Sequence, residues 1–393
     1  MRLLKFILAG LMTTVVMTGV SLRVKAEEDF TYEVINENSI SVKCANKSMK
    51  QAKIPEKIDG YTVTTLADKC FDGCTALESV TIPATVDHLG MYVFEGCSEL
   101  KNVNIPESVT EIKEFCFEGC IKLEEITVDE GNTAYCSRDG VLFTKSCDTL
   151  IRYPQEKEAE NYQVPDECRT ISPWAFTDSQ HLRDLSMSKV ERIGADAFMG
   201  SIRLRNVTLS NDIEELIGAS FAKCPLLMTI QLPSKLKSIG ERCFFDCIRL
   251  RSIEFPDTLQ TIGKMAFYGC VELGEVTIPS SVKTIEENGI GFSVDTNGEN
   301  AVIPNITLNV DFGSPAYDYA RESGVAFHAK VSGNIIMLVV VIILMLALLV
   351  VGIVITIKQN QLAKVAEQEQ KEEEERLKKV AALQERRKQR KNE

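Results

Sequence analysis

A phenylalanine recurs at nearly constant spacing through most of this chain. Successive positions are 22 or 23 residues apart, except for one step of 59 residues. A leucine follows each phenylalanine six residues later, so two independent positions share one period. A regular period of this length indicates a chain built from structural units that stack on one another. The phenylalanines are Phe71, Phe94, Phe117, Phe176, Phe198, Phe221, Phe244 and Phe267.

The residues of each unit follow a common pattern, which is clearest between Leu100 and Cys120. Val103 and Ile105 alternate with polar residues, as in a strand with one buried face. Pro106 comes next and ends the strand at a corner, because proline has no N–H to donate to a neighbouring strand. A period of 20 to 29 residues with spaced leucines is typical of leucine-rich solenoids. The predicted fold class is therefore a β-rich repeat solenoid of leucine-rich repeats, followed by a single C-terminal transmembrane α-helix.

The ends of the repeat array carry sequences suited to capping, which a solenoid needs because a terminal repeat would leave its core open to water. Residues 30–34 and 40–42 alternate like the two strands of a hairpin. After the repeats, Ser314 and Pro315 are typical of the start of a helix, and Gly324 is typical of its end.

The step of 59 residues contains an insertion, residues 129–163. Asp139-Gly140 is typical of a turn, and residues 141–143 and 150–153 are typical of strands. We interpret the insertion as a hairpin added to one repeat, which leaves the solenoid continuous. The predicted domains are a signal peptide (1–26), an N-terminal cap (27–53), leucine-rich repeats (54–302), a C-terminal cap and stalk (303–334), a transmembrane helix (335–357) and a charged, helical cytoplasmic tail (358–393).

Two apolar segments predict export and membrane anchoring. Residues 1–26 have a basic start, an apolar stretch and a small-residue cleavage site, which is typical of a secretory signal peptide; an uncleaved signal anchor is the alternative. Residues 335–357 contain no charged residue and are long enough to span a bilayer. Lysine and arginine are more frequent after this segment than before it, so the positive-inside rule places the C-terminus in the cytoplasm. The predicted location is the plasma membrane, with a single pass and the N-terminal domain extracellular.

Charge is distributed unevenly along the chain. The net charge of −12 includes +4 in residues 1–26 and +3 in residues 358–393, which leaves −19 for the part between them. Nucleic-acid binding depends on neutralising phosphates with lysine and arginine. So acidic a domain argues against nucleic acid as a partner.

The repeat pattern resembles that of the BspA-like leucine-rich repeat surface proteins over residues 28–330. The resemblance rests on the Ile-Pro corner and on the part of the insertion that runs from Gly131-Asn132 to Gly140-Val141-Leu142-Phe143. It also rests on the pair Ala-Phe, at Ala175-Phe176, Ala197-Phe198 and Ala266-Phe267. The Asn ladder of the general leucine-rich pattern is missing. The resemblance implies surface exposure and adhesion or binding, but it implies no particular ligand.

The chain contains 13 cysteines, all between residues 44 and 270. Neighbouring side chains of a parallel ladder point the same way and seldom reach the torsion of a disulfide bond. We expect most of these cysteines to be buried free thiols. A partial set of disulfides is the alternative, with Cys136 and Cys147 as the first pair to test. Six cysteines share one repeat position: Cys74, Cys97, Cys120, Cys224, Cys247 and Cys270.

No residue pattern typical of catalysis stands out. His88, His181 and His328 are the only histidines, and none belongs to a recognisable nucleophile motif. The cysteine spacings follow the core pattern and lack a second pair at zinc-site spacing. We therefore predict no enzymatic activity, no metal site and no cofactor.

The polar residues that alternate with the buried strand positions are the candidate ligand-binding residues. They would form a polar ladder on one surface of the solenoid, although solvated strand positions without a ligand are the alternative. This ladder is nearly free of aromatic side chains, which argues against a tight protein interface. The candidates are Asn102, Asn104, Glu125, Thr127, Asp184, Ser186, Asn206, Thr208, Thr229, Gln231, Ser252 and Glu254.

The sequence thus predicts a membrane-anchored surface protein that mediates adhesion or binds an extracellular protein or glycan. Two alternatives stay open: a passive structural spacer of the cell envelope, and a single-pass receptor that signals through its tail. The sequence leaves the oligomeric state undetermined.

Overall fold

The computed structural model describes residues 24–26, 29–331 and 333–389. These residues belong to two compact units, and the boundary between them in the sequence lies between Lys330 and Val331. The predicted signal peptide lies outside the described residues, except for Val24–Ala26, which form strand β1.

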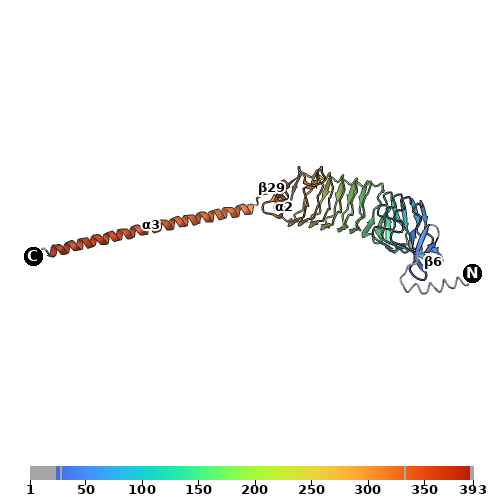
Figure 1. The fold of residues 1–393 in the computed structure, drawn as a ribbon, viewed down its shortest axis with the longest axis horizontal. Helices are drawn as coiled ribbons and strands as arrows, with labels where there is room; N and C mark the ends of the chain where they lie inside the picture. Colours follow the sequence, from blue (N-terminus) through green and yellow to red (C-terminus); the bar gives the residue numbers. More distant parts are fainter. Residues whose placement is uncertain (1–23, 27–28, 332, 390–393) are drawn as a thin grey trace, which may run out of the picture. The chain divides into compact units, whose positions relative to one another are not determined.

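The first unit is a solenoid in which each repeat adds one turn of chain (Figure 1). The periodic phenylalanines are buried and their rings stack from repeat to repeat. Phe71, Phe94 and Phe117 form one row with centroids 5.5 and 5.7 Å apart. The predicted repeat solenoid is confirmed, and this stacking explains why the phenylalanine spacing is so regular.

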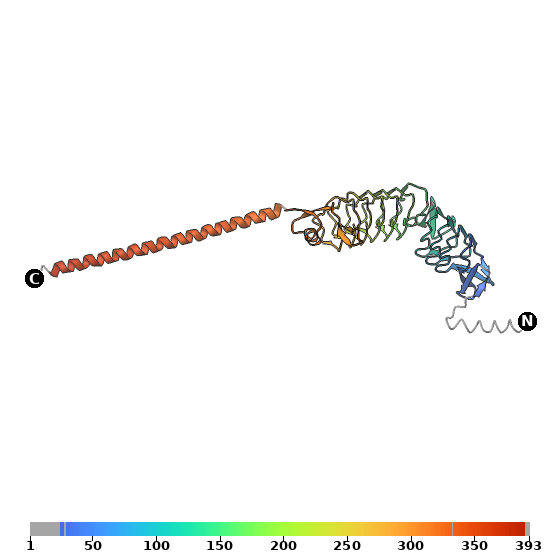
Figure 2. The same ribbon diagram turned by 45° about the horizontal axis from the view of Figure 1, so that its top comes forward.

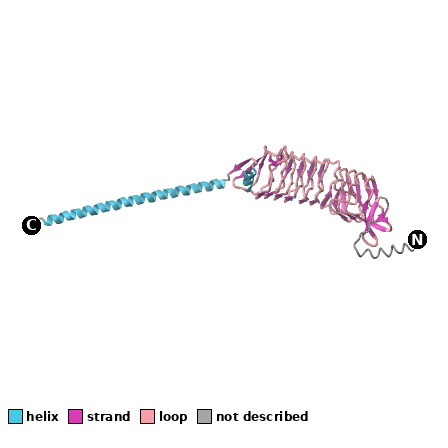
Figure 3. Ribbon diagram, viewed as in Figure 1, coloured by secondary structure: helices cyan, strands magenta, loops and turns pink. Residues whose placement is uncertain are grey.

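Most turns supply a strand to a first parallel ladder just before the proline corner. Short strands joined by longer loops give the layered appearance of Figure 3. The ladder is divided into three sheets. The first contains β4 (Gln51–Lys53), β7 (Ser79–Thr81), β9 (Asn102–Ile105) and β11 (Glu125–Val128); the second contains β15 (Asn161–Gln163), β17 (Asp184–Ser186), β19 (Asn206–Thr208) and β21 (Thr229–Gln231); the third contains β24 (Glu275–Thr277), β28 (Thr307–Asp311) and β29 (Phe327–Lys330).

A second ladder of two-residue strands follows the corner in most turns. Glycine comes after several of these strands, because successive turns approach closely there: a Cβ on Gly263 would lie 2.7 Å from the backbone C of Gly240. The strands are β8 (His88–Leu89) and β10 (Glu111–Ile112), then β16 (Thr170–Ile171) and β18 (Arg192–Ile193), then β20 (Glu215–Leu216), β22 (Ser238–Ile239), β23 (Thr261–Ile262) and β25 (Thr284–Ile285).

The N-terminal cap extends this second ladder with longer strands. β2 (Phe30–Val34) and β3 (Ser39–Cys44) form the predicted hairpin, and β1 pairs with β2. β6 (Tyr61–Leu66) joins β3 in parallel and also pairs with β5 (Lys57–Ile58). Phe30 packs edge-on against Phe71, with centroids 6.3 Å apart, and so covers the first ring of the row.

The insertion forms β12 (Tyr135–Arg138), β13 (Val141–Thr144) and β14 (Thr149–Arg152), as an antiparallel meander. It also divides the buried core into two clusters: Leu142 packs in the N-terminal cluster, whereas Val141 and Phe143 pack in the C-terminal one. β13 therefore acts as a partition between the two. Figures 1 and 2 show the stack changing direction near this teal segment. The predicted hairpin is present, but the parallel ladders on its two sides belong to separate sheets.

The C-terminal cap is a helix packed under the last strands. α2 (Pro315–Ser323) begins at Ser314, whose side chain accepts a hydrogen bond from the Tyr317 N–H, and it ends at Gly324 with φ 76°. Both ends agree with the predicted capping residues. A hairpin of β26 (Phe292–Val294) and β27 (Asn300–Val302) precedes this cap.

All 13 cysteines are thiols, and most are buried. Five of the six at the shared repeat position donate to the carbonyl of the stacked phenylalanine in the preceding repeat, as Cys247 does to Phe221 at 3.1 Å. Ser201 occupies the same position and donates to the Phe176 carbonyl at 3.0 Å. The thiols thus serve as small buried hydrogen-bond donors. The other four are Cys97, Cys120, Cys224 and Cys270.

The second unit is one helix, α3 (Gly333–Gln389). It contains both the predicted membrane segment and most of the predicted tail. Its most apolar stretch is exposed along its whole length in the described part of the chain. By length and composition, α3 is a candidate for crossing a membrane.

Candidate functional site: polar ladders, an N-terminal groove and an aromatic row

The first group of predicted site residues lies side by side on β9 and β11. Asn102 is opposite Glu125, and Asn104 is opposite Thr127. The Thr127 hydroxyl donates to Asn104 Oδ1 at 2.9 Å, and Asn104 Nδ2 donates to Asp129 Oδ1 at 3.0 Å. These hydrogen bonds fix the orientation of the Asn104 amide on the surface of the sheet.

The second group lies on β17, β19 and β21. Asp184, Asn206 and Thr229 form one row, and Ser186, Thr208 and Gln231 form the parallel row two residues further along each strand. Asn206 Nδ2 donates to Asp184 Oδ1 at 2.6 Å. Ser252 continues the first row through a bridge to Thr229. Glu254 is exposed and follows two residues later, outside the named strands.

The structure therefore places ten of the twelve predicted residues in two groups, which belong to two different sheets, and Ser252 and Glu254 follow the second group outside the named strands. The meander of the insertion separates the groups, so a ligand of modest size would contact only one of them. Residues at equivalent strand positions extend both ladders and were missed among the candidates, although they occupy the same place before the Ile-Pro corner. They are Gln51, Lys53, Ser79 and Thr81 in the first sheet, and Asn161 and Gln163 in the second.

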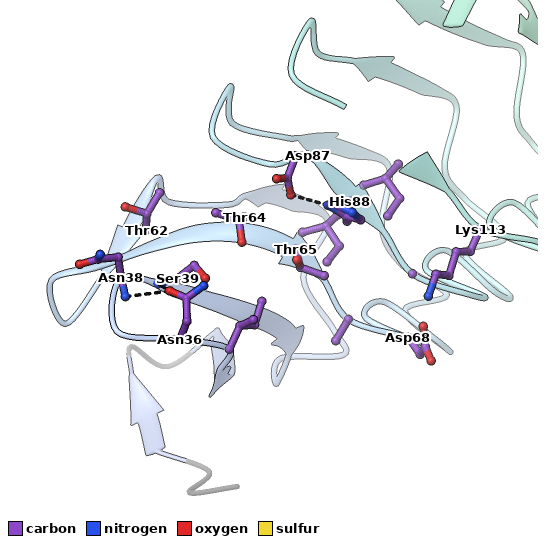
Figure 4. Close-up of a pocket in the computed structure, with 15 residues that line it drawn as sticks. Asn36, Asn38, Ser39, Thr62, Thr64, Thr65, Asp68, Asp87, His88 and Lys113 are labelled. Atoms are coloured by element: carbon purple, nitrogen blue, oxygen red, sulfur yellow. Dashed lines mark hydrogen bonds and ion pairs between the residues drawn. The ribbon is translucent and has the colours of Figure 1, made fainter. Parts of the chain in front are cut away.

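A polar groove of about 770 Å³ lies over the second ladder at the N-terminal end (Figure 4). The turn between β2 and β3 forms one wall with Asn36 and Asn38, and Thr64 of β6 lies across from it. His88 Nδ1 is 2.6 Å from Asp87 Oδ1, and its Nε2 is 3.3 Å from Glu111 Oε2. The groove combines amide, hydroxyl, carboxylate and imidazole groups, which suits a ligand rich in hydroxyl or amide groups.

An aromatic row lies on the segments that follow three strands of the second ladder, β8, β10 and β16. The rings of Tyr92 and Phe115 stack with centroids 4.9 Å apart, and Phe115 meets Trp174 edge-on at 5.7 Å. Lys69 Nζ lies 5.1 Å from the Tyr92 centroid. All three aromatic side chains are half-buried. Each lies two residues before a stacked phenylalanine, and this repeated offset is the sequence signal that identifies them.

The backbone of the aromatic row has positive φ: 58° at Tyr92, 60° at Phe115 and 61° at Trp174. Such angles are unusual for residues other than glycine and often mark functional sites. Here, however, Lys69, with φ 58°, and Asp196, with φ 55°, have the same conformation in other repeats. The conformation therefore belongs to the repeat, and only the choice of aromatic residues is particular to this stretch.

The family model for the BspA type leucine rich repeat region matches six copies, over residues 38–140, 154–227 and 218–310. The chain belongs to the BspA-type leucine-rich repeat family. These matches cover most of both ladders and stop short of α3, so family membership concerns the solenoid. No curated protein matches the chain.

Solved structures share the fold of this BspA-type chain at low sequence identity. The pneumococcal vaccine antigen PcpA is 18% identical, with a TM-score of 0.50, over 80% of this chain and 100% of that structure. A leucine rich cell surface protein from Faecalibacterium prausnitzii is 22% identical, with a TM-score of 0.43, over 66% of this chain and 95% of that one. A leucine-rich repeat protein from Eubacterium ventriosum is 18% identical, with a TM-score of 0.45, over 72% of this chain and 100% of that one.

Proposed function

We propose that α3 anchors the protein in the plasma membrane through residues 335–357, with the solenoid outside the cell and residues 358–393 in the cytoplasm. The side chains of α3 described between residues 336 and 387 are exposed. A helix with so long an uncovered apolar surface is stable in lipid rather than in water. The basic residues after the apolar segment support the proposed orientation.

We further propose that the solenoid binds an extracellular protein or glycan through its polar ladders, in an adhesive role and without chemical conversion of the ligand. The observation that carries this proposal is the register of Asp184 with Asn206 and Thr229, which repeats one polar position across three turns. Solenoids commonly bind through such extended surfaces. Orientated amide and carboxylate groups at regular spacing suit a ligand that itself repeats, and this favours binding over a purely structural spacer.

Membrane anchoring is tested by expressing the full chain beside a variant that ends at Asn334. We expect the full chain to remain with membranes after alkaline extraction. We also expect protease added to intact cells to cleave the solenoid. The shortened variant should be released in soluble form. Full protection of the solenoid in intact cells would contradict the proposed orientation.

Ligand binding is tested by applying the detergent-solubilised full chain to arrays of glycans and matrix proteins. The double variants Asn102→Ala with Asn104→Ala, and Asp184→Ala with Asn206→Ala, probe the two groups separately. Glu215→Ala is the matched control, since this exposed carboxylate lies on the second ladder. We expect one double variant to weaken binding at least tenfold while the control does not. Absence of saturable binding by the unmodified chain would favour the spacer alternative.

A cellular experiment addresses the receptor alternative. Removal of residues 360–393 keeps the apolar segment and the solenoid but deletes the tail. If a ligand found on the arrays elicits the same cellular response with and without the tail, signalling through the tail is excluded, and an adhesive role is favoured.

A further inference from the structure

Two cysteines of the insertion differ from those of the repeats. All six cysteines at the shared repeat position are buried, and five of them donate to backbone carbonyls. Among the 13 cysteines, Cys136 is the one that is only partly buried, and its Sγ lies 2.9 Å from the Sγ of Cys147. The other close pair, Cys44 and Cys74, lies 3.6 Å apart in the N-terminal core, where both residues are buried.

The local backbone holds Cys136 and Cys147 toward each other. Cys136 lies on β12 opposite Phe143 of β13, and its thiol donates to the Thr144 carbonyl at 3.2 Å. The Cys147 N–H donates to the same carbonyl at 2.9 Å, in a turn where Cys147 has φ 58°. A side-chain hydrogen bond of 2.7 Å from Thr144 to Asp148 closes this turn. Both cysteines are therefore positioned around one carbonyl group.

We propose that Cys136 and Cys147 form a disulfide bond in the mature protein, while the cysteines of the repeat positions stay reduced. The sulfur atoms need to approach by only about 1 Å to reach the length of a disulfide bond. This inference rests on the proposed function in one respect, since it requires the solenoid to lie in an oxidising compartment.

The bond forms by thiol–disulfide exchange with an external disulfide, either a small molecule or an oxidoreductase. One thiolate attacks the oxidant, gives a mixed disulfide and releases one thiolate of the oxidant. The second cysteine thiolate then displaces the other sulfur of the oxidant. Two cysteine thiols lose two protons and two electrons, and the oxidant becomes a dithiol or two thiols.

Exchange belongs to the folding process rather than to the folded protein. Burial, followed by the contact with Cys147, raises the pKa of Cys136 to about 12. A protonated thiol is a poor nucleophile. The folded, reduced protein should therefore oxidise slowly, whereas an insertion that has not yet packed against the repeats can react.

The disulfide bond would restrain β13, the strand that separates the two core clusters. Cys136 precedes β13 in the chain and Cys147 follows it, 11 positions apart in sequence. β13 contributes side chains to both core clusters. A covalent link that closes this segment, which contains β13, restrains the strand on which both clusters depend.

The geometry is tested by refolding the reduced, purified full chain in detergent with a glutathione redox buffer. Free thiols are then alkylated under denaturing conditions, and the protein is digested with trypsin. We expect a reducible link between the peptides 123–138 and 146–152, while Cys97 and Cys120 are alkylated. Alkylation of both Cys136 and Cys147, or links from either to other cysteines, would overturn the proposal.

Variants provide controls for this experiment. Cys136→Ser keeps a hydroxyl donor for Thr144 but should leave Cys147 free to be alkylated. Cys97→Ser should leave the link intact. The unfolding midpoint of the oxidised protein should fall when a reductant is added, and the midpoint of Cys136→Ser should not respond.

The same peptide analysis on protein alkylated during lysis of intact cells tests the location separately. A link in this sample supports the disulfide and an exported solenoid together. Free thiols in cells, combined with a link after refolding, would overturn the exported location and the disulfide in the cell, although the geometry would stand.

Discussion

The Tyr153 ring stacks on the Phe176 ring with centroids 4.8 Å apart. Tyr153 is thus the first ring of the second row of stacked aromatic rings in the core. Tyr153 is fully buried. Its hydroxyl makes only a long contact of 3.5 Å to the Ala159 carbonyl, so the ring rather than the hydroxyl is the stabilising part. The tyrosine replaces the phenylalanine that the insertion displaces from the period.

Tyr153→Ala should destabilise the C-terminal core by about 3–5 kcal/mol, because it removes a large buried ring. Tyr153→Phe is the control and should cost no more than about 1 kcal/mol. Trp174 is the only tryptophan of the chain, and the Ala175 carbonyl beside it accepts from the Tyr153 N–H at 2.8 Å. Its fluorescence during urea unfolding therefore reports on this region. Equal unfolding midpoints for both variants would contradict the role of the ring.

Gly263→Ala should disturb the contact between two successive turns. The added Cβ would meet backbone atoms of Gly240 and Glu241 at 2.7 and 2.8 Å, and backbone cannot move aside as a flexible side chain can. We expect a loss of about 1–3 kcal/mol, seen as faster hydrogen exchange in residues 238–262. Gly274→Ala is the matched control, since its Cβ would have no neighbour within 4 Å. This variant should leave hydrogen exchange in residues 238–262 unchanged.

Ser201→Cys should be tolerated, whereas Ser201→Ala should cost about 1 kcal/mol. The cost stays small because Ser179 also donates to the Phe176 carbonyl, at 2.7 Å, so this acceptor keeps a partner. Urea unfolding followed by circular dichroism measures both changes. If the thiol were as costly as the alanine, the interpretation of the repeat cysteines as buried donors would be wrong.

Arg152→Met should steepen the dependence of stability on pH. The guanidinium is 6% exposed and donates through Nη1 to the Trp174 carbonyl, while Nε and Nη2 have no partner among the described residues. Burial raises the pKa of Asp178, and the charge of Arg152 lowers it again in part. Without that charge, the pKa of Asp178 should rise further.

When folding raises the pKa of a carboxyl group, the folded protein loses stability as pH rises. The loss begins near the pKa of the unfolded state, about 3.9, and ends above the raised pKa of the folded state. Trp174 fluorescence during urea unfolding, measured from pH 4 to 7, should therefore show a larger decline for Arg152→Met than for the unmodified protein. Adding Asp178→Asn should remove part of the extra decline, because the charge of Arg152 also lowers the raised pKa of Glu118. An unchanged pH profile in Arg152→Met would contradict the coupling between these two residues.

The sequence was sufficient to predict the stacked phenylalanines and the capping helix, because both depend on local patterns. It was not sufficient to predict the partition of the core. Val141, Leu142 and Phe143 are three consecutive apolar residues, so no alternation indicates that the strand faces two different clusters.

The candidate site was predictable to a similar extent. Alternation predicted which side chains of β9 and β19 are exposed, and the structure shows their register. Where one sheet ends and the next begins depends on how the chain packs, and the periodicity of the sequence does not indicate it. The contact between Phe115 and Trp174 was also hidden, since it joins residues on opposite sides of the insertion.

Because β13 gives Leu142 to one core cluster and Val141 and Phe143 to the other, the buried cores of the two arrays are separate clusters that adjoin at this strand. Duplication or loss of whole repeats in one array would leave the packing of the other nearly untouched. The solenoid can thus change its length in evolution by altering one array while the other keeps its shape.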